Sequence, residues 1–174
     1  MSDDAATPWR VREATSQDCG ALALVGAATF LESFAGVLRG PEIVAHCARA
    51  HAPDAYARYL DDGGRAWLAE LDAGAAPVGY ALSTRPDLPG AREDDAELKR
   101  IYVLSRFQGD GMAAALLQQV VSAAQGSRRL LLGVYERNAR ALAFYRKHGF
   151  APVGTRRFDV GGTLYDDLVL ARPL

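Results

Sequence analysis

The chain has 174 residues, of which 49% are hydrophobic, and this suffices for one compact domain with a substantial core. Its formal charge of -1 supplies no overall positive field, so we expect neither nucleic acid nor a membrane as a partner. Cys19 and Cys47 show no CxxC or Cys/His spacing, so neither a disulfide framework nor a metal site is indicated. The first residues lack a signal-peptide pattern, and no apolar run reaches the roughly 18 residues that span a bilayer. We expect a cytoplasmic protein.

Hydrophobic periodicity, capping residues and turn residues divide the chain into strands and helices. We expect a disordered lead over residues 1–8 and a single domain over residues 9–174. Strands are predicted at 9–14, 65–71, 77–85, 96–104, 129–135, 152–160 and 164–171. Helices are predicted from the cap at 15–18 to about 36, from Pro41 onward, and at 53–60, 111–124 and 138–148. This order predicts an α/β fold with one central mixed sheet of about six to seven strands and helices on both faces.

The strand predicted at 96–104 carries charges near its start and apolar residues near its end. Regular alternation assigns one face to Glu97, Lys99, Ile101 and Val103, and the other to Leu98, Arg100, Tyr102 and Leu104.

A glycine pair lies between this strand and the helix that follows it. Gly109 and Gly111 lack a Cβ atom, so the backbone there can come close to a ligand. The free N–H groups of the helix's first turn, together with the positive end of its dipole, make an anion site. A tight turn without a ligand explains the glycines equally well, so the pair alone decides nothing.

Two other nucleotide-binding motifs were compared with this segment. A Walker loop requires Gly-Lys-Ser/Thr, but Met112 and Ala113 follow Gly111, so that motif is absent. The segment 109–114 does satisfy the loose dinucleotide form G-x-G-x-x-A, and Glu136 follows the next strand. However, the strand before the loop begins with charged residues, and too little chain follows Glu136 for further parallel β-α units.

Two motifs together give a more specific answer. Residues 108–113, Gln-Gly-Asp-Gly-Met-Ala, match the cofactor loop Q/R-x-x-G-x-G/A of the GCN5-related N-acetyltransferase (GNAT) superfamily. Residues 138–150 resemble that family's N-x-x-A-x-x-F-Y-x-K-x-G-F helix at every fixed position. The segments 29–34, 97–103 and 166–170 are most similar to the PaiA-like spermidine/spermine acetyltransferase branch. The resemblance implies the GNAT fold, with a splayed cofactor cleft between the fourth and fifth strands.

The resemblance also implies acetyl-coenzyme A (acetyl-CoA) as cosubstrate and no metal. The residues that it places at the cofactor are Ile101, Tyr102, Val103, Gln108, Gly109, Asp110, Gly111, Met112, Ala113, Asn138, Tyr145 and Lys147. Asp110 stands where the family often has a basic residue, and because a carboxylate would repel pyrophosphate, we expect its side chain to point outward.

Two residues are the catalytic candidates. Tyr145 matches the family's usual proton donor to the coenzyme A thiolate, although a large aromatic on an amphipathic helix also serves the core. Glu97 lies six positions before Val103, where some family members place a glutamate general base. A carboxylate at the start of a strand also fits an exposed acid or an anchor for a cationic substrate.

The predicted reaction is direct acetyl transfer to a primary amine in a ternary complex. A polyamine is the first acceptor expected. The resemblance to the PaiA-like branch implies it, and Glu32 with the acids at 93–95 could make an acidic mouth that attracts polyamines. Phe34 and Tyr135 are the other substrate candidates. The alternatives are a protein N-terminus, a lysine or a xenobiotic amine as acceptor, and a non-catalytic acyl-CoA-binding module. A homodimer is a reasonable expectation for the oligomeric state.

Overall fold

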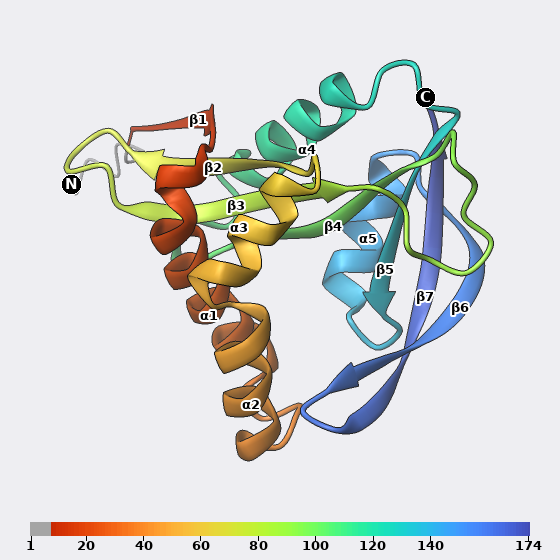
Figure 1. Ribbon diagram of the computed structural model, residues 1–174, viewed down its shortest axis with the longest axis horizontal. Coiled ribbons are helices and arrows are strands. Elements are labelled where there is room, and N and C mark those ends of the chain that lie inside the picture. Colours follow the sequence, from red (N-terminus) through yellow and green to blue (C-terminus); the bar gives the residue numbers. More distant parts are fainter. Residues whose placement is uncertain (1–7) are drawn as a thin grey trace, which may run out of the picture.

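The computed structural model of the chain describes residues 8–174 and contains one seven-stranded sheet, in the order β1-β2-β3-β4-β5-β7-β6 (Figure 1). The strands are β1 Trp9–Glu13, β2 Arg65–Leu71, β3 Pro77–Thr84, β4 Ala96–Val103, β5 Arg129–Tyr135, β6 Ala151–Val160 and β7 Thr163–Pro173. The α-helices are α1 Cys19–Phe34, α2 Gly40–Ala50, α3 Pro53–Asp61, α4 Met112–Ala123 and α5 Ala139–Lys147. Short 3-10 turns at Ser16–Asp18 and Ser105–Phe107 complete the series. The predicted mixed sheet is confirmed.

Helices cover both faces of the sheet, and each face has its own core. On one face, Leu116 and Leu117 of α4 pack with Val78, Leu98 and Leu132 of the strands. Residues of α5 join that core. On the other face, α1 and α3 pack over the tyrosines and leucines of β2 and β3. The sheet is therefore the middle layer, which separates α4 and α5 from α1 to α3 (Figure 1).

A bulge in β4 changes which of its side chains share a face. Leu82 of β3 pairs with Arg100, whereas the next residue, Ser83, pairs with Leu98, so Lys99 is the extra residue. Because one inserted residue reverses the alternation, Leu98 lies on the α4 side with Ile101 and Val103. The predicted alternation, which put Glu97 and Lys99 on that face with Ile101 and Val103, is wrong for this reason.

The parallel pair β4–β5 is joined only at its start. Ala96 pairs with Leu130 and Glu97 with Leu131, and no pairing follows along the remainder of β4. The other neighbouring strands are antiparallel and pair over most of their length. The two strands thus diverge toward their C-terminal ends, which confirms the predicted opening between the fourth and fifth strands.

The predicted disordered lead covers residues 1–8. Of the predicted lead, residues 1–7 lie outside the described residues, but Pro8 is described, and its carbonyl accepts a hydrogen bond from the Asp72 N–H at 2.9 Å. Pro8 is thus attached to the sheet. No helix within residues 8–174 is long and apolar enough to cross a membrane.

Candidate active site

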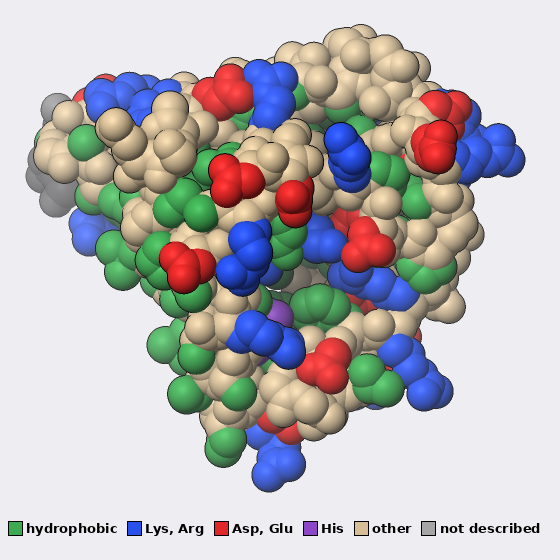
Figure 2. All heavy atoms as spheres, viewed as in Figure 1, with side chains coloured by type: hydrophobic (Ala, Val, Ile, Leu, Met, Phe, Trp, Pro, Cys, Tyr) green, Lys and Arg blue, Asp and Glu red, His purple; other side chains and the backbone are tan. Residues whose placement is uncertain are grey.

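A cleft of about 1460 Å³ opens where β4 and β5 diverge. Its lining comes from the C-terminal halves of β4 and β5, the N-terminal ends of α4 and α5, parts of α1 to α3, and the β6–β7 hairpin. A space-filling view shows a hollow near the middle of one face, with Lys and Arg side chains around it and a histidine inside (Figure 2). Elements far apart in sequence therefore meet around one opening.

The N-terminal end of α4 has the properties of an anion site. The N–H groups of residues 111–114 have no acceptor within residues 8–174, and the first backbone bond of the helix runs from the Ala115 N–H to the Gly111 carbonyl. Gly109 and Gly111 have φ angles of 103° and 81°, which L side chains rarely adopt, and the space beside each is empty. Both glycines line the cleft, so these N–H groups can receive a phosphate.

The edge of β4 that faces the cleft extends this site. Ile101, Tyr102 and Val103 line the cleft and have no β5 partner. Gln108 also lines it, and its Nε2 donates to the Val103 carbonyl at 2.9 Å, which fastens the loop to the end of β4. An extended ligand chain with amide groups fits beside such a free strand edge.

Three other residues of the loop were predicted to contact the cofactor, and the structure separates them. Ala113 lines the cleft. Asp110 is exposed and is not among the lining residues, as expected for a side chain that points away from an anion site. Met112 is 1% exposed and packs in the core beneath α4, so only its backbone N–H faces the loop.

The start of α5 brings a second set of polar groups to the cleft. Asn138 caps this helix, because its Oδ1 accepts from the Ala141 N–H at 3.1 Å, and its amide Nδ2 keeps both protons free. Tyr145 lies two turns further along the same helix, and Lys147 is exposed beside it. All three line the cleft, so the helix motif and the loop motif meet at one site.

The Tyr145 side chain combines a buried ring with a hydroxyl that has no partner. The residue is 8% exposed, its ring packs against Phe144 and Phe150, and its Oη makes no hydrogen bond within residues 8–174. Burial, and next the neighbouring Tyr102, raise the pKa of Tyr145 far above its usual value. The phenol is therefore protonated at neutral pH and can donate a proton into the cleft.

The structure gives Glu97 a position that does not suit a general base. The side chain is 1% exposed, and it is not among the residues that line the cleft. Its Oε2 accepts from the Asp87 N–H at 2.6 Å, and Oε1 lies 3.4 Å from Lys99 Nζ. This carboxylate lies where β4 and β5 are still paired. Its contacts therefore support an anchoring role for the segment before β4.

The residues predicted to contact the acceptor do come together. Glu32 and Phe34 at the end of α1 and Tyr135 at the end of β5 all line the cleft. The Phe34 and Tyr135 rings meet edge to face at 6.4 Å, and Tyr165 of β7 contacts Tyr135 in the same way. The Glu32 carboxylate accepts from the N–H and Oγ of Ser105 at 2.7 and 2.6 Å, so it fastens α1 to the loop after β4.

The acidic mouth predicted for a polyamine does not form. Asp95 is buried, and its carboxylate accepts from Arg128 and Arg129, with the shortest of these contacts at 3.0 to 3.2 Å. None of the acids at 93–95 lines the main cleft, and Glu93 and Asp95 border a separate, smaller hollow. The prediction placed these acids beside Glu32, but in the fold they lie outside the cleft that Glu32 lines.

Two segments at opposite ends of the chain enclose the acceptor side. The Glu42 carboxylate of α2 accepts from Thr163 Oγ1 and from the Tyr165 hydroxyl, both at 2.6 Å. Those hydrogen bonds lower the pKa of Glu42. Gly161 in the hairpin turn has a φ of 60°, and a Cβ there would meet the Glu42 backbone at 2.6 Å. Helix α2 and the β6–β7 hairpin meet in this way at one edge of the molecule (Figure 1).

Sequence reasoning assigned no role to three polar residues that the fold brings to the cleft: Arg100, His46 and His51. The histidines are 4% and 5% exposed, and their rings lie 5.6 Å apart. Burial, and next the Arg100 charge, lower the pKa of His46 to about 4 and that of His51 to about 3. One indication of such a role was present in the sequence, because Arg100 is a charged residue in the middle of a predicted strand. No group of His, Cys, Asp and Glu within residues 8–174 has the geometry to hold a metal ion.

This fold and cleft define a class of protein. The model of the acetyltransferase (GNAT) family matches residues 31–150, and the chain belongs to that family. It is an acetyl-CoA-dependent acyltransferase. An uncharacterized N-acetyltransferase of Mycobacterium tuberculosis is 38% identical over 160 residues, which cover 90% of this chain and 98% of that relative. The same figures apply to an uncharacterized N-acetyltransferase of Mycobacterium bovis.

Solved structures agree on the fold. The PaiA N-acetyltransferase of Thermoplasma acidophilum, solved with coenzyme A, aligns with a TM-score of 0.79 over 96% of this chain and 99% of its own, at 17% identity. A ribosomal-protein-alanine N-acetyltransferase of Brucella melitensis aligns with a TM-score of 0.69 over 95% and 99% of the two chains, at 25% identity. The groups at the α4 terminus and the β4 edge fit the cosubstrate acetyl-CoA.

Proposed function

We propose that the chain transfers an acetyl group from acetyl-CoA to a primary amine by direct attack in a ternary complex. One observation carries this proposal: the helix start with its free N–H groups, the unpaired edge of β4 and Tyr145 all line the same cleft. Acetyl-CoA supplies an activated acetyl group, so the protein must hold both substrates, orient them and manage protons.

The loop and the strand edge bind the long cosubstrate in this proposal. The N–H groups at 111–114 bind its pyrophosphate, with support from the helix dipole, and the β4 backbone at 101–103 pairs with its amide-containing arm. Lys147 is exposed at the cleft and adds positive charge. The Asn138 Nδ2 donates toward the reactive end, because its Oδ1 is already used in capping α5.

As the neutral amine forms the C–N bond and the C–S bond breaks, Tyr145 donates a proton to the departing sulfur. The proton that the nitrogen loses passes to solvent in the open cleft, and solvent returns a proton to the Tyr145 phenolate. The Tyr145 Oη has no other partner within residues 8–174, and the raised pKa keeps the proton in place until a thiolate develops nearby. Glu97 does not take part in proton transfer, because its carboxylate accepts a hydrogen bond from the Asp87 backbone N–H and lies outside the cleft. The proposal therefore contains one proton-donating side chain and no covalent enzyme intermediate.

Several classes of amine are candidates for the acceptor. A polyamine was the expectation from the sequence, and the PaiA N-acetyltransferase, at 17% identity, shares the fold with this chain without naming an acceptor for it. Protein N-termini, lysines and xenobiotic amines are the other amines to test. The relatives at 38% identity are themselves uncharacterized N-acetyltransferases, so they support the reaction and not an acceptor.

Free-thiol release measured with acetyl-CoA and a panel of amines tests this function. The panel contains spermidine, amino acids, their amides, simple alkylamines, and peptides with free N-termini or lysines. We expect thiol release that depends on at least one amine, with the acetylated amine found by mass spectrometry. Acetyl-CoA binding in a calorimeter without amine-dependent thiol release would instead identify a non-catalytic binding module. Sedimentation of the purified protein checks the predicted homodimer.

A further inference from the structure

Arg100 is a half-buried cation in the cleft without a carboxylate partner. Its guanidinium donates from Nη1 to the Ala50 carbonyl at 3.0 Å and lies 5.4 Å from the ring centres of Tyr56 and Tyr59. No carboxylate oxygen within residues 8–174 lies within 4.0 Å of it. A guanidinium has five N–H donors in a planar fork, so most of its donors are unused by the protein.

A second arginine of the cleft, Arg156, differs from Arg100 because a carboxylate pairs with it. Arg156 lies over Phe158, and its guanidinium contacts the Asp167 carboxylate at 3.1 Å. Gly133 makes room for it, because a Cβ there would lie 2.5 Å from the guanidinium. Arg156 therefore has an internal counter-ion and Arg100 does not, although both line the same cleft.

Two unpartnered ring nitrogens lie near Arg100. His46 Nδ1 and His51 Nε2 are buried and have no hydrogen-bond partner within residues 8–174, and both residues line the cleft. His51 Nδ1 is already engaged by the Tyr56 hydroxyl at 2.8 Å, so its Nε2 is the free atom. Buried polar atoms are rarely left unpaired, and a ligand is one way to satisfy them.

The position of Arg100 separates it from the cosubstrate phosphates. Helix α4, whose N-terminal end is the anion site, packs on the sheet face of Leu98 and Val103. The Arg100 guanidinium instead contacts Ala50, at the end of α2, and the two tyrosines of α3. These helices lie on the opposite face of the sheet (Figure 1). The unused donors of Arg100 therefore belong to the acceptor side.

The acids that line the cleft are mostly engaged by other groups of the protein. Its lining contains eight Lys or Arg residues and only four Asp or Glu residues. Three of the four acids are engaged. Glu32 accepts from Ser105, and Asp167 pairs with Arg156. Asp159 accepts from the Gly162 N–H and lies 4.0 Å from Arg49. On the acceptor side the four acids equal the arginines 49, 58, 100 and 156 in number. A polycation would therefore find only Asp62 without such a contact within residues 8–174, whereas an anion would gain the planar donor fork of Arg100.

We propose that the acceptor is a small amine that also carries a carboxylate, and that Arg100 receives this carboxylate while the amine faces the acetyl group. The aromatic side chains beside Arg100 bound the remainder of the acceptor, and the free nitrogens of His46 and His51 complete its hydrogen bonding. This assignment rests on the proposed acetyl transfer and names the class of acceptor for it.

Matched pairs of acceptors test the assignment on the wild-type enzyme. Each amino acid is compared with its amide and its decarboxylated amine, at saturating acetyl-CoA, by thiol release. A series of α-, β- and γ-amino acids varies the distance between amine and carboxylate. We expect kcat/KM for at least one acid to exceed that of its amide by tenfold or more, because a charged pair is lost in the amide.

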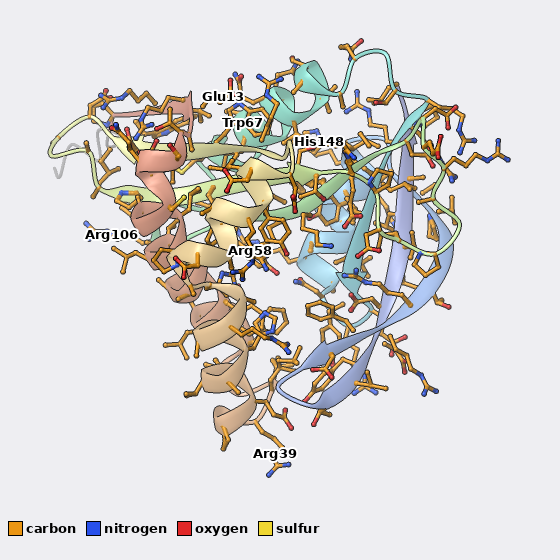
Figure 3. The ribbon with its side chains drawn as sticks, viewed as in Figure 1. Glu13, Arg39, Arg58, Trp67, Arg106 and His148 are labelled. Atoms are coloured by element: carbon orange, nitrogen blue, oxygen red, sulfur yellow. The ribbon has the colours of Figure 1, made fainter. Side chains whose placement is uncertain are left out.

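Variants of Arg100 test the residue itself. R100Q should raise the acceptor KM about tenfold or more for the acid and change it little for the amide, because only the acid uses the charge. R100K, which keeps the charge without the fork, should be intermediate. R58Q is the matched control: Arg58 is an exposed arginine on α3 at the same cleft (Figure 3), and its loss should change KM little. The Kd of acetyl-CoA should be unchanged in all three variants.

Two results would overturn the proposal, and they differ. If neutral amides or spermidine are acetylated as well as the acids, and R100Q affects every amine equally, the carboxylate assignment is wrong while acetyl transfer stands. If no amine supports thiol release although acetyl-CoA binds, the proposed function fails and this assignment fails with it. The acid-to-amide ratio of the wild-type enzyme decides the first case even if R100Q does not fold.

Discussion

The two sides of the cleft are built in different ways. The cofactor side comes from the continuous segment 96–150, in which β4, α4, β5 and α5 follow one another. The acceptor side combines α1 to α3, which end at Asp61, with the β6–β7 hairpin, which begins at Ala151. The first side offers mainly backbone N–H groups as donors. The second side presents side chains such as Glu42 and also Arg100, which β4 contributes from its other face. The first side can therefore be shared by a family, and the second can differ between its members.

Of the changes considered, removing the Tyr145 hydroxyl should have the largest effect. The residue affected belongs to the cofactor side, and the quantity affected is kcat. Y145F should lower kcat by about a hundredfold or more, because general acid catalysis contributes 10²–10⁴. The Kd of acetyl-CoA should change little, because the ring and its packing are retained. Single-turnover rates and calorimetry measure the two effects. Y80F is the control, since the Tyr80 hydroxyl is also buried without a partner but does not line the cleft. Equal kcat values for Y145F and wild type would remove Tyr145 as the donor.

Acid should destabilise the acceptor side through its two buried histidines. In the fold, the pKa values of His46 and His51 are lowered to about 4 and about 3, from 6.5 in an unfolded chain. Below pH 6.5 the unfolded chain therefore binds protons that the folded chain does not, and stability falls as the pH drops toward 4. At pH 5 this linkage amounts to about 1–2 kcal/mol for each histidine.

Urea unfolding at pH 7, 6 and 5 measures this loss. The double variant H46Q/H51Q should lose less stability between pH 7 and 5 than the wild type, because two of the titrating groups are absent. Proton NMR of the histidine rings is an independent check that needs no variant, since His46 and His51 should remain neutral throughout this range. A ring that titrates near pH 6.5 would contradict the buried arrangement.

The loop at 108–113 and the helix at 138–150 could be recognised in the sequence because their determinants are local. Gly109 and Gly111 are required by left-handed backbone angles within one loop, and Asn138 and Tyr145 lie on one short helix at fixed spacing. Strand and helix boundaries were also predicted to within a few residues, since periodicity reports which side of an element is buried.

The acceptor side could not be predicted in the same way. The bulge at Lys99 depends on how β4 pairs with β3, so alternation placed Glu97 beside Ile101 and Val103 incorrectly. Arg100 was overlooked because its significance is that no carboxylate within residues 8–174 pairs with it, which depends on every neighbouring element. The acids at 93–95 were predicted to line the cleft together with Glu32, but Asp95 instead forms ion pairs with Arg128 and Arg129.

A substitution at Gly111, compared with one at Gly126, should distinguish the loss of stability caused by backbone strain from the loss of acetyl-CoA binding. G111A places a Cβ where the cosubstrate pyrophosphate approaches, so the Kd of acetyl-CoA should rise about tenfold or more. G126A is the matched control, because Gly126 also has a positive φ, of 97°, with empty space beside it, but does not line the cleft. Each variant should lose roughly 1–2 kcal/mol of stability from a left-handed L-residue. Equal effects on acetyl-CoA binding in a calorimeter would show that the loop does not bind the phosphates.

The smallest effect should come from loosening the contact that encloses the acceptor side. E42Q replaces the carboxylate that accepts from Thr163 Oγ1 and Tyr165 with an amide, so the hairpin is held less firmly against α2. The acceptor KM should rise roughly fivefold through misplacement of the pocket walls, with the Kd of acetyl-CoA unchanged. E93Q is the control, since Glu93 is exposed and lies outside the main cleft. If E42Q instead weakened acetyl-CoA binding and acceptor binding by the same factor, the two sides would not be independent.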